Sequence, residues 1–400
     1  MQIGITGKPN IGKSTMFKAI TLQDVAIANY PFTTIEPNKG YGYVRVEDIG
    51  PEFNVKSNPR YGFIKGKYRF VPIEILDIAG LVPGAHEGRG LGNKFLDDVR
   101  QADALIHVID ISGSTNEEGQ YIALGNYDPT KDVKWYEEEI DWWFYGVIKK
   151  NLEKNIRKIK NEHLELDKEL AKLISGLNVK EEHVSKAFNE LKINQDEYDI
   201  INDDKRLFEL ASKIRKIAKP IVIAANRVDI NIDIAKKNLE RLKKEYPDKV
   251  IIPTSGYAEL ILKELDKQGK IFYIPGESYF EIKGDLSDKE KKALEFIENY
   301  IFKEFGSTGV QNILDITVFD VLKYVAVFPG GVDSLADKEG RILPDCFLMP
   351  PGSTVIDFAN KIHSDLAKNF VRAIDVKTRK FLGKDYILKH RDVIQIVANA

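Results

Sequence analysis

The segment 7–14 has the residue types and the spacing to bind a phosphate chain. It reads Gly-Lys-Pro-Asn-Ile-Gly-Lys-Ser and fits the pattern G-x-x-x-x-G-K-[ST], with an apolar run before it and a helix-like run after it. Its glycines allow backbone N–H groups to surround a phosphate, and a helix N-terminus adds partial positive charge. Lys13 would reach the β- and γ-phosphates and Ser14 would bind Mg²⁺, although a glycine-rich turn can match this pattern by chance. The expected phosphate-binding residues are Lys8, Pro9, Asn10, Ile11, Gly12, Lys13, Ser14 and Thr15.

Asp77 and Gly80 form a second candidate group for phosphate chemistry. Residues 71–76 predict a strand, and the sequence Asp-Ile-Ala-Gly follows it, with Asp77 first and Gly80 last. A carboxylate at this place can hold Mg²⁺ through water, and the Gly80 N–H can donate a hydrogen bond to a γ-phosphate. This D-x-x-G segment therefore predicts a loop that senses hydrolysis.

Leu81 occupies the position at which Ras-like enzymes carry the glutamine that orients the attacking water. A leucine cannot orient water. Hydrolysis is then slow, or it uses another group such as His86 or Glu87, or it depends on a cation or a partner. For His86, an exposed or packing role is the alternative.

The polar segment 28–38 is interrupted by prolines and carries Thr33 and Thr34. A nucleotide switch needs a loop whose hydroxyl binds Mg²⁺ only when a γ-phosphate is present. A surface loop with two β-branched residues is the alternative interpretation.

Asp229 is the candidate for recognising a base. An apolar run over residues 220–225 leads into Asn-Arg-Val-Asp, the pattern N-x-x-D, which ends at Asp229. A carboxylate here can accept hydrogen bonds from the N1–H and the 2-amino group of guanine, a pair of donors that adenine lacks. A second turn, which follows a strand predicted at 251–254, has a backbone that could touch the base. The expected base-binding residues are Asn226, Arg227, Asp229, Ser255 and Gly256.

These motifs need strands that deliver them to a common place. Residues 104–110 are almost continuously apolar, as expected for a strand that helices cover on both faces of a sheet. With the strands that precede the other motifs, they predict a P-loop α/β domain formed by residues 1–130 and 206–310.

Residues 131–205 interrupt this domain with a charged sequence of helical character. Their apolar residues recur at steps of three, four or seven, which predicts a long helix with a narrow apolar seam that folds back on a second helix as a hairpin. The insertion is either a structural element or an arm that binds a partner. The seam residues are Ile148, Leu152, Ile156, Ile159, Leu166, Leu170, Leu173 and Leu177.

Residues 320–400 predict a small ββαββ β-grasp domain. Apolar runs at 324–328 and 343–349 are followed by a helix that opens at Ser353 or Thr354, and further strands are expected near Ala373 and Val393. Between residues 361 and 392, Lys and Arg number nine and Asp numbers four, a net charge of +5. This local excess suggests contact with RNA phosphates, and a solvated face is the alternative.

Composition limits the class of protein. A chain of 400 residues is too long for one ordinary core, so two or three domains are expected. Its 59 Lys and Arg against 61 Asp and Glu give a net charge of −2, so any contact with nucleic acid must come from a local patch. The single cysteine, Cys346, excludes an internal disulfide framework and fits a reducing compartment. No apolar run approaches the ~18 residues of a membrane span, so we expect a cytoplasmic protein without a membrane partner.

Together these motifs resemble the Obg/YchF group of translation-factor GTPases. The resemblance rests on residues 7–14, 30–34, 77–85 and 90–93, and the helical insertion resembles that of the archaeal YchF-like branch. It implies a Ras-like G domain, GTP as substrate with Mg²⁺, and Thr34 as the metal ligand of the first switch. Some members also use K⁺, held partly by the residue equivalent to Asn10. The C-terminal segment resembles a TGS domain, a ubiquitin-like module, and ribosome or RNA is the implied partner.

Three positions bear on how closely the chain follows this family. Arg227 stands where lysine is usual, although its aliphatic stem could still lie over a base. Gly256 stands where alanine is common after the serine. Asp229 is present, whereas most members recognised as adenine-binding lack it, so guanine is favoured.

The expected reaction is attack of water on a γ-phosphate. Lys13, Thr34 and Gly80 would be the catalytic groups, and Ser14, Thr34 and Asp77 would hold Mg²⁺. One alternative is an ATPase of the YchF type. Another is a nucleotide-sensing RNA- or ribosome-binding module in which hydrolysis is incidental. The sequence does not indicate the oligomeric state.

Overall fold

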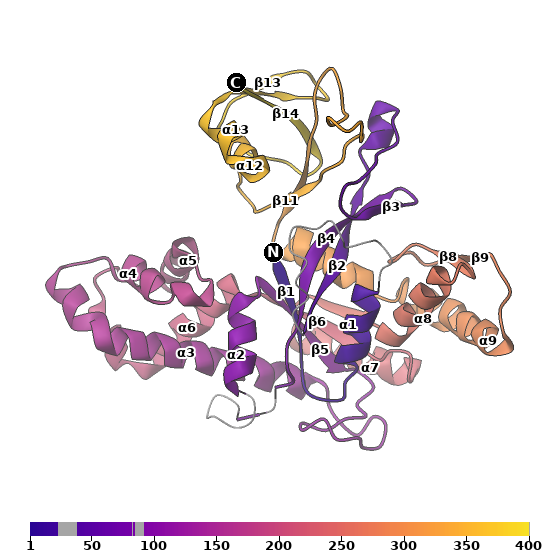
Figure 1. Cartoon of the computed structure of the whole chain (residues 1–400). Helices are drawn as coiled ribbons and strands as arrows, with labels where there is room; N and C mark the ends of the chain where they lie inside the picture. Colours follow the sequence, from indigo (N-terminus) through magenta and orange to yellow (C-terminus); the bar gives the residue numbers. More distant parts are fainter. Residues whose placement is uncertain (23–37, 82, 85–91, 400) are drawn as a thin grey trace. The chain divides into compact units, whose positions relative to one another are not determined.

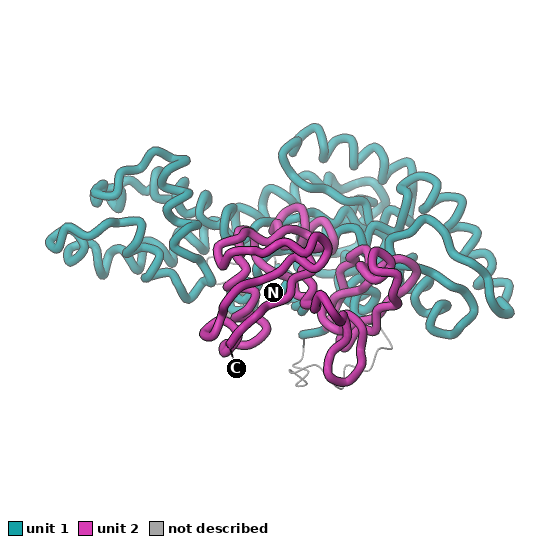
Figure 2. The backbone as a smooth tube through the Cα atoms, turned by 90° about the horizontal axis from the view of Figure 1, so that it is seen from above, with its two compact units in different colours: residues 1–22, 36–40, 74–313 teal, residues 23–35, 41–73, 314–400 magenta. Residues whose placement is uncertain are grey.

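The structure is a computed structural model that describes residues 1–22, 38–81, 83–84 and 92–399, and of residues 92–94 and 96 it describes the backbone alone (Figure 1). The chain forms two compact units (Figure 2). Of the described residues, the first unit contains 1–22, 38–40 and those within 74–313, and the second contains 41–73 and 314–399. Thr33, Thr34, His86 and Glu87 lie outside the described residues. Of the helices that the structure describes, none has the length and apolar character needed to cross a bilayer.

Seven strands of the described chain form one sheet, in the order β2-β4-β1-β5-β6-β7 with β3 paired to β4. Strand β1 is parallel to β4 and β5, and β6 is parallel to β5 and β7. The register places Ile5 beside Asp77, and Asn226 beside both Asp110 and Thr254. The carboxyl ends of the parallel strands therefore meet at one edge of the sheet, where ligands bind in such folds. The strands are β1 (Gln2–Thr6), β2 (Lys39–Glu47), β3 (Phe63–Lys65), β4 (Tyr68–Asp77), β5 (Ala104–Asp110), β6 (Ile221–Asn226) and β7 (Ile251–Thr254).

Helices and a small hairpin complete the first unit. Helix α1 packs against α8, and α7 packs against β7. Ser287 caps α9 together with Glu290, and a π-helical stretch continues that helix. The elements are α1 (Lys13–Thr21), α2 (Gly92–Gln101), α7 (Ile232–Glu245), α8 (Gly256–Lys267), β8 (Ile271–Tyr273), β9 (Phe280–Ile282), α9 (Asp288–Phe296), η6 (Ile297–Phe302), α10 (Lys303–Phe305) and α11 (Val310–Asp315).

The predicted helical insertion contains more helices than a hairpin. The long helix is α3 (Thr130–Asn161), and it packs against α6 (Asp204–Ala218), to which the chain returns after α4 (Leu166–Leu173) and α5 (Glu181–Leu191). Figure 1 shows these helices on the opposite side of the sheet from α8 and α9. The apolar seam is confirmed, because six of its eight residues are buried and the other two pack against the same core. Short 3₁₀ turns, η4 (Ser175–Leu177) and η5 (Tyr198–Asn202), connect the helices.

The second unit contains the predicted β-grasp fold. Its sheet has the order β11-β10-β14-β12-β13, in which β10 and β14 are parallel neighbours, and α12 covers one face through Val355, Phe358 and Ala359. Thr354 and Asp357 form a capping box at the start of α12, so the predicted start of this helix is confirmed. The elements are η7 (Ile316–Val321), β10 (Val325–Pro329), β11 (Phe347–Met349), α12 (Val355–Ile362), α13 (Ser364–Lys368), β12 (Phe370–Asp375), β13 (Phe381–Leu382) and β14 (Asp392–Ala398).

Residues 41–73 cluster with the C-terminal residues, although sequence patterns placed them in the phosphate-binding domain. The backbone N–H groups of Asn58 and Arg60 donate to the carbonyls of Ile342 and Pro344, each at 2.8 Å. The Arg69 guanidinium, 1% exposed, donates to the carbonyls of Leu343 and Pro344 at 2.6 Å. Between β2 and β4 the chain forms the short 3₁₀ helix η2 (Gly50–Phe53) and the strand β3.

Candidate functional site

The segment between β1 and α1 has the backbone of an anion-binding loop. Gly7, Asn10 and Gly12 have φ values of 142°, 61° and 90°, all in the region that L side chains rarely adopt. Gly12 is the N-cap of α1 and no side chain caps the helix, so its first N–H groups have no side-chain acceptor. Ser14 is exposed in the first turn. A helix start of this kind favours a bound phosphate.

Two of the glycines are required by close neighbours. A Cβ at Gly12 would lie 2.7 Å from Nδ2 of Asn226, and a Cβ at Gly7 would lie 2.4 Å from the carbonyl oxygen of Val108. Gly80 lies against the loop from the other side, since a Cβ there would be 3.3 Å from Pro9. The structure thus brings the D-x-x-G segment and the phosphate loop together.

Lys13 and Asp77 are neighbours at the phosphate end. Lys13 Nζ lies 3.4 Å from the carbonyl oxygen of Lys8, so the side chain curls over its own loop. Burial lowers the pKa of Lys13, and the charge of Asp77 opposes this shift. Burial likewise raises the pKa of Asp77, which Lys13 opposes. An anionic ligand and a metal ion would replace the water that these two groups have lost.

The side chain of Lys8 is turned away from the loop it belongs to. Its Nζ lies 2.8 Å from Oδ2 of Asp132, donates to the carbonyl of Thr115 at 3.0 Å, and sits 4.0 Å from the centre of the Tyr127 ring. Both charged side chains are 1% exposed. The nucleotide contact predicted for Lys8 is therefore limited to its backbone.

Asn226 connects the phosphate loop to the second turn at the sheet edge. Its Nδ2 donates to the carbonyl of Ile11 at 3.0 Å, and its Oδ1 accepts from the Gly256 N–H at 3.1 Å. Gly256 in turn lies against α1, because a Cβ there would be 3.1 Å from Cα of Met16. One buried amide thus fixes three parts of the site.

Asp229 and Ser255, each predicted to bind the base, are hydrogen-bonded to one another. Ser255 Oγ donates to Oδ1 of Asp229 at 2.6 Å and accepts from the Ala258 N–H at 3.1 Å, as the N-cap of α8. The Ser255 N–H donates to the carbonyl of Thr308 at 2.9 Å. Asp229 is half-buried. Its carboxylate is oriented by a hydroxyl whose own position the helix start fixes.

Arg227 is held by several acceptors. Its φ is 71°, and its guanidinium donates to the carbonyl of Asn10 at 2.6 Å and lies 3.2 Å from Oδ2 of Asp110. The same group lies 5.6 Å from the centre of the Tyr121 ring. Asn10 also uses its Nδ2, which donates to the carbonyl of Gly119 at 3.1 Å. The arginine at the usual lysine position therefore ties β6 to the phosphate loop.

Asp110 was not predicted as a site residue. It is fully buried at the end of β5 and accepts from the hydroxyls of Ser112, Ser114 and Thr115 at 2.5, 2.8 and 2.9 Å, in addition to Arg227. The run Ile-Ser-Gly-Ser-Thr after a strand-terminal aspartate is the sequence signal that could have indicated it. These bonds hold the loop after β5 beside the phosphate loop.

The residues present fit a magnesium ion held together with a nucleotide. The described residues contain no group of three His, Cys, Asp or Glu that could hold a metal alone. Ser14 is exposed at the start of α1, where no side chain caps the helix. Asp77 is the last residue of β4, and its carboxylate lies beside Lys13. In phosphoryl-transfer sites, Mg²⁺ is typically bound by one hydroxyl and one carboxylate of the protein, and phosphate oxygens supply further ligands.

Three family models match the chain in order along its length. The "50S ribosome-binding GTPase" model matches residues 2–138, the "Obg-like GTPase YGR210-like, G4 motif-containing domain" model matches 224–331, and the "TGS domain" model matches 338–398. The GTP-binding protein MJ1332 of Methanocaldococcus jannaschii is 45% identical over 100% of this chain and 99% of its own. The ribosome-binding ATPase YchF of Buchnera aphidicola is 30% identical over 99% of this chain and 98% of its own. The chain belongs to the Obg/YchF family.

Two solved structures share the fold of the whole chain. The GTP binding protein from Pyrococcus horikoshii OT3 is 35% identical, covers 100% of both chains and has a TM-score of 0.79. The Schizosaccharomyces pombe YchF GTPase shares the fold, with 21% identity, a TM-score of 0.59 and coverage of 99% of this chain and 97% of its own. The chain is thus a member of the YchF family, with a P-loop GTPase domain and a C-terminal TGS domain.

Proposed function

We propose that this protein slowly hydrolyses GTP to GDP and phosphate. In this proposal it acts as a switch, because its contact with ribosome or RNA differs between the GTP-bound and GDP-bound states. The observation that carries the proposal is the Asp229 carboxylate, oriented by Ser255 at the sheet edge that also holds the phosphate loop. Guanine presents two N–H donors to such a carboxylate, and adenine presents none at these positions.

At the phosphate end, each group has a separate task. The N–H groups at the start of α1 bind phosphate oxygens, and Lys13 neutralises charge on the β- and γ-phosphates. Ser14, Asp77 and Thr34 would hold Mg²⁺, which when bound neutralises further charge on the transferred group. Gly80 would donate its N–H to the γ-phosphate from its place beside Pro9. Asn10 would offer its side-chain oxygen to K⁺, since its amide nitrogen is engaged by Gly119.

Slow turnover follows from the place of Leu81. Its side chain is 3% exposed and belongs to the apolar cluster that contains Phe95 and Tyr136. A hydrocarbon side chain in this position donates no hydrogen bond to an attacking water. Hydrolysis then depends on the phosphate contacts and on whatever group or ion a partner supplies.

ATP is the second candidate substrate, because the Buchnera aphidicola relative is named an ATPase. The two substrates share every contact to the phosphates. They differ at Asp229, where an adenine would leave the carboxylate facing a C–H group and a ring nitrogen without a donor. The expected preference is therefore for GTP.

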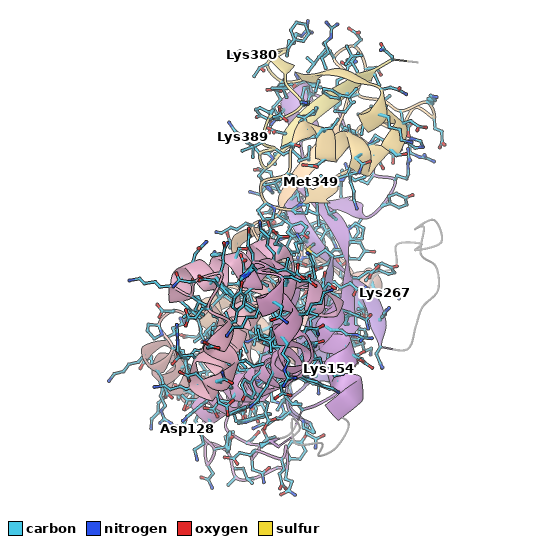
Figure 3. All side chains as sticks on the ribbon, turned by 90° about the vertical axis from the view of Figure 1, so that its left-hand side faces the viewer. Asp128, Lys154, Lys267, Met349, Lys380 and Lys389 are labelled. Carbon is cyan, nitrogen blue, oxygen red and sulfur yellow. The ribbon has the colours of Figure 1, made fainter. Side chains whose placement is uncertain are left out.

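A ribosome or RNA partner is supported by two features. The Methanocaldococcus and Buchnera relatives cover the whole chain, and the Buchnera protein is named ribosome-binding. Of the basic residues between 361 and 392, Lys377 and Arg391 pair with Glu52, and the others are exposed. Figure 3 labels two of these, Lys380 and Lys389, on the C-terminal unit. In this proposal residues 1–130 and 206–310 bind the nucleotide, and the insertion 131–205 and residues 320–400 are the two appendages available to a partner.

The test is phosphate release from GTP and from ATP by the full chain with Mg²⁺, alongside Lys13→Ala. The expected result is slow release that is faster with GTP and lost in the variant. Co-sedimentation with ribosomes in GTP, GDP or no nucleotide should then differ between at least two states. Equal co-sedimentation with ribosomes in all three nucleotide states would show a binding protein that is not a switch. Faster phosphate release from ATP than from GTP would show an ATPase.

A further inference from the structure

One face of α3 contacts three different parts of the nucleotide site. Asp132 Oδ2 lies 2.8 Å from Lys8 Nζ in the phosphate loop, and the Tyr136 hydroxyl donates to Thr6 Oγ1 at 2.8 Å at the end of β1. Glu139 Oε1 accepts the backbone N–H of Gly84 at 2.5 Å. Positions 132, 136 and 139 follow the steps of four and three that place residues on one side of a helix. The helix that begins the insertion is therefore fitted to the phosphate loop and to the chain beyond Gly80.

Leu81 adds an apolar contact to the same helix. It is buried in a cluster with Tyr136, Ile140 and Phe144, which continue the stripe of α3 toward the insertion. Its backbone N–H donates to the carbonyl of Gly7 at 3.3 Å. The residue after Gly80 is thus bonded to the phosphate loop through its backbone, and its side chain is buried in the apolar cluster to which α3 contributes.

A neighbouring face of α3 holds α6. Arg215 Nε donates to Asp141 at 2.6 Å, Ser212 Oγ donates to the same carboxylate at 2.6 Å, and Arg215 Nη2 lies 3.4 Å from Glu137. Arg215 is 2% exposed. Helix α6 leads into β6, which ends at Asn226 in the base-binding part of the site. Helix α3 therefore contacts both the phosphate loop and the helix that precedes the base-binding residues.

We propose that Leu81 and Glu139 are positioning residues that fix the chain beyond Gly80 to α3, and so couple the γ-phosphate site to the helices of the insertion. The inference rests on the proposed GTPase activity. Gly80 faces Pro9 of the phosphate loop, where an added Cβ would come within 3.3 Å, and Leu81 and Gly84 are described residues that follow it in the chain. Both are attached to α3, which runs as one helix from Thr130 to Asn161 and carries α4 and α6 packed on it.

The Glu139 side chain suits this role because it is nearly buried, at 9% exposed. A backbone N–H to carboxylate bond in such a place is stronger than one between neutral groups. Glutamine retains a carbonyl acceptor at the same reach, whereas alanine removes the acceptor. Glu138, one residue earlier, is exposed and gives a matched control on the same turn of helix.

The experiment compares the full chain with Glu139→Ala, Glu139→Gln and Glu138→Ala. Two quantities are measured: kcat and KM for GTP hydrolysis, and backbone hydrogen exchange over residues 140–191 with Mg²⁺ and either GDP or a non-hydrolysable GTP analogue. In the unmodified chain and in Glu138→Ala, exchange over 140–191 should differ between the two nucleotides. In Glu139→Ala, kcat should fall by about tenfold with KM within about twofold, and the exchange difference should disappear. Glu139→Gln should recover most of both.

The outcomes separate the two proposals. If the unmodified chain neither binds nor hydrolyses GTP, the proposed function is wrong. If it does both and Glu139→Ala behaves as Glu138→Ala does, the coupling is wrong. Should Glu139→Ala fail to fold, Leu81→Val removes one methylene group from the same anchor, and the coupling then predicts a smaller exchange difference at unchanged GDP affinity. An undiminished difference in Leu81→Val would overturn it.

Discussion

The hydroxyl of Ser255 donates to the carboxylate of Asp229 across 2.6 Å, and the same oxygen accepts the N–H of Ala258 at the start of α8. This arrangement fixes which oxygen of Asp229 remains for a base and in which direction it points. It also links base recognition to α8, which packs against α1 and thus against the phosphate loop.

Asp229→Asn should reverse the choice of base. The amide would place an N–H₂ group against the 2-amino group of guanine, with a loss of about 2–4 kcal/mol, or at least thirtyfold in affinity. Xanthosine triphosphate carries an oxygen at C2, which such an amide can satisfy, so its affinity should rise. Fluorescence titration of GTP and XTP measures both changes. Asp233→Asn, an exposed aspartate on α7, is the control and should change neither; unchanged GTP selectivity in Asp229→Asn would show that this carboxylate does not read the base.

Leu81→Gln should not accelerate hydrolysis. The side chain at this position is buried among Phe95, Tyr136 and Ile140, so a glutamine there faces the apolar cluster rather than a bound nucleotide. Burying its amide should cost about 2–3 kcal/mol in the free energy of unfolding, and turnover should not rise above that of the unmodified chain. Denaturant unfolding and single-turnover kinetics test the two parts, with Leu124→Gln, 41% exposed, as a control of little effect. A tenfold gain in rate would mean that the loop reorients to present residue 81.

Lys8→Met should destabilise the protein because it removes the cation that pairs with Asp132. Asp132 would keep a buried carboxylate without a cation, which typically costs about 3–5 kcal/mol. Burial already raises the pKa of Asp132, and Lys8 is the main group that opposes this shift. The double variant Lys8→Met with Asp132→Asn keeps an acceptor for the Tyr127 hydroxyl and should regain much of the loss. If the double variant loses as much unfolding free energy as the two single variants lose together, the ion pair does not stabilise this region.

His107 should make stability depend on pH below neutrality. Burial lowers the pKa of His107 to about 3, and the charges of Lys8, Lys249 and Lys13 act in the same direction. The imidazole ring stacks on the Tyr136 ring, with the two ring centres 3.9 Å apart. The unfolded chain therefore binds a proton between pH 6.5 and about 3 that the folded chain refuses, so stability falls as the pH is lowered through this window. His107→Phe should flatten the slope of unfolding free energy against pH there, by up to about 4–5 kcal/mol over the window. An equal slope in the unmodified chain and in His107→Phe would assign the effect to carboxylates.

The fold was predictable where local spacing determines it. The glycine-lysine-serine segment, the D-x-x-G segment and the N-x-x-D segment each follow an apolar strand, and parallel strands bring their carboxyl ends together. The apolar seam, which is divided among α3, α4 and η4, and the capping box at Thr354 are equally local signals, and both are confirmed.

Long-range contacts were not predictable in this way. Lys8 belongs to the phosphate-loop pattern, yet its side chain pairs with Asp132, which is more than a hundred residues away and gives no sign of its partner in the sequence. The same holds for Arg69, which bonds carbonyls near residue 343 and draws residues 41–73 into the second unit. Such contacts depend on tertiary packing, and a single charged residue in a sequence does not show whether it is buried or paired.

The most direct test is a binding titration of GTP, GDP and ATP on the purified chain in the presence of Mg²⁺. The Asp229 and Ser255 pair predicts that GTP and GDP bind at least about tenfold more tightly than ATP. ATP binding as tight as GTP binding, or no binding of guanosine nucleotides, would contradict the central claim that this site holds GTP.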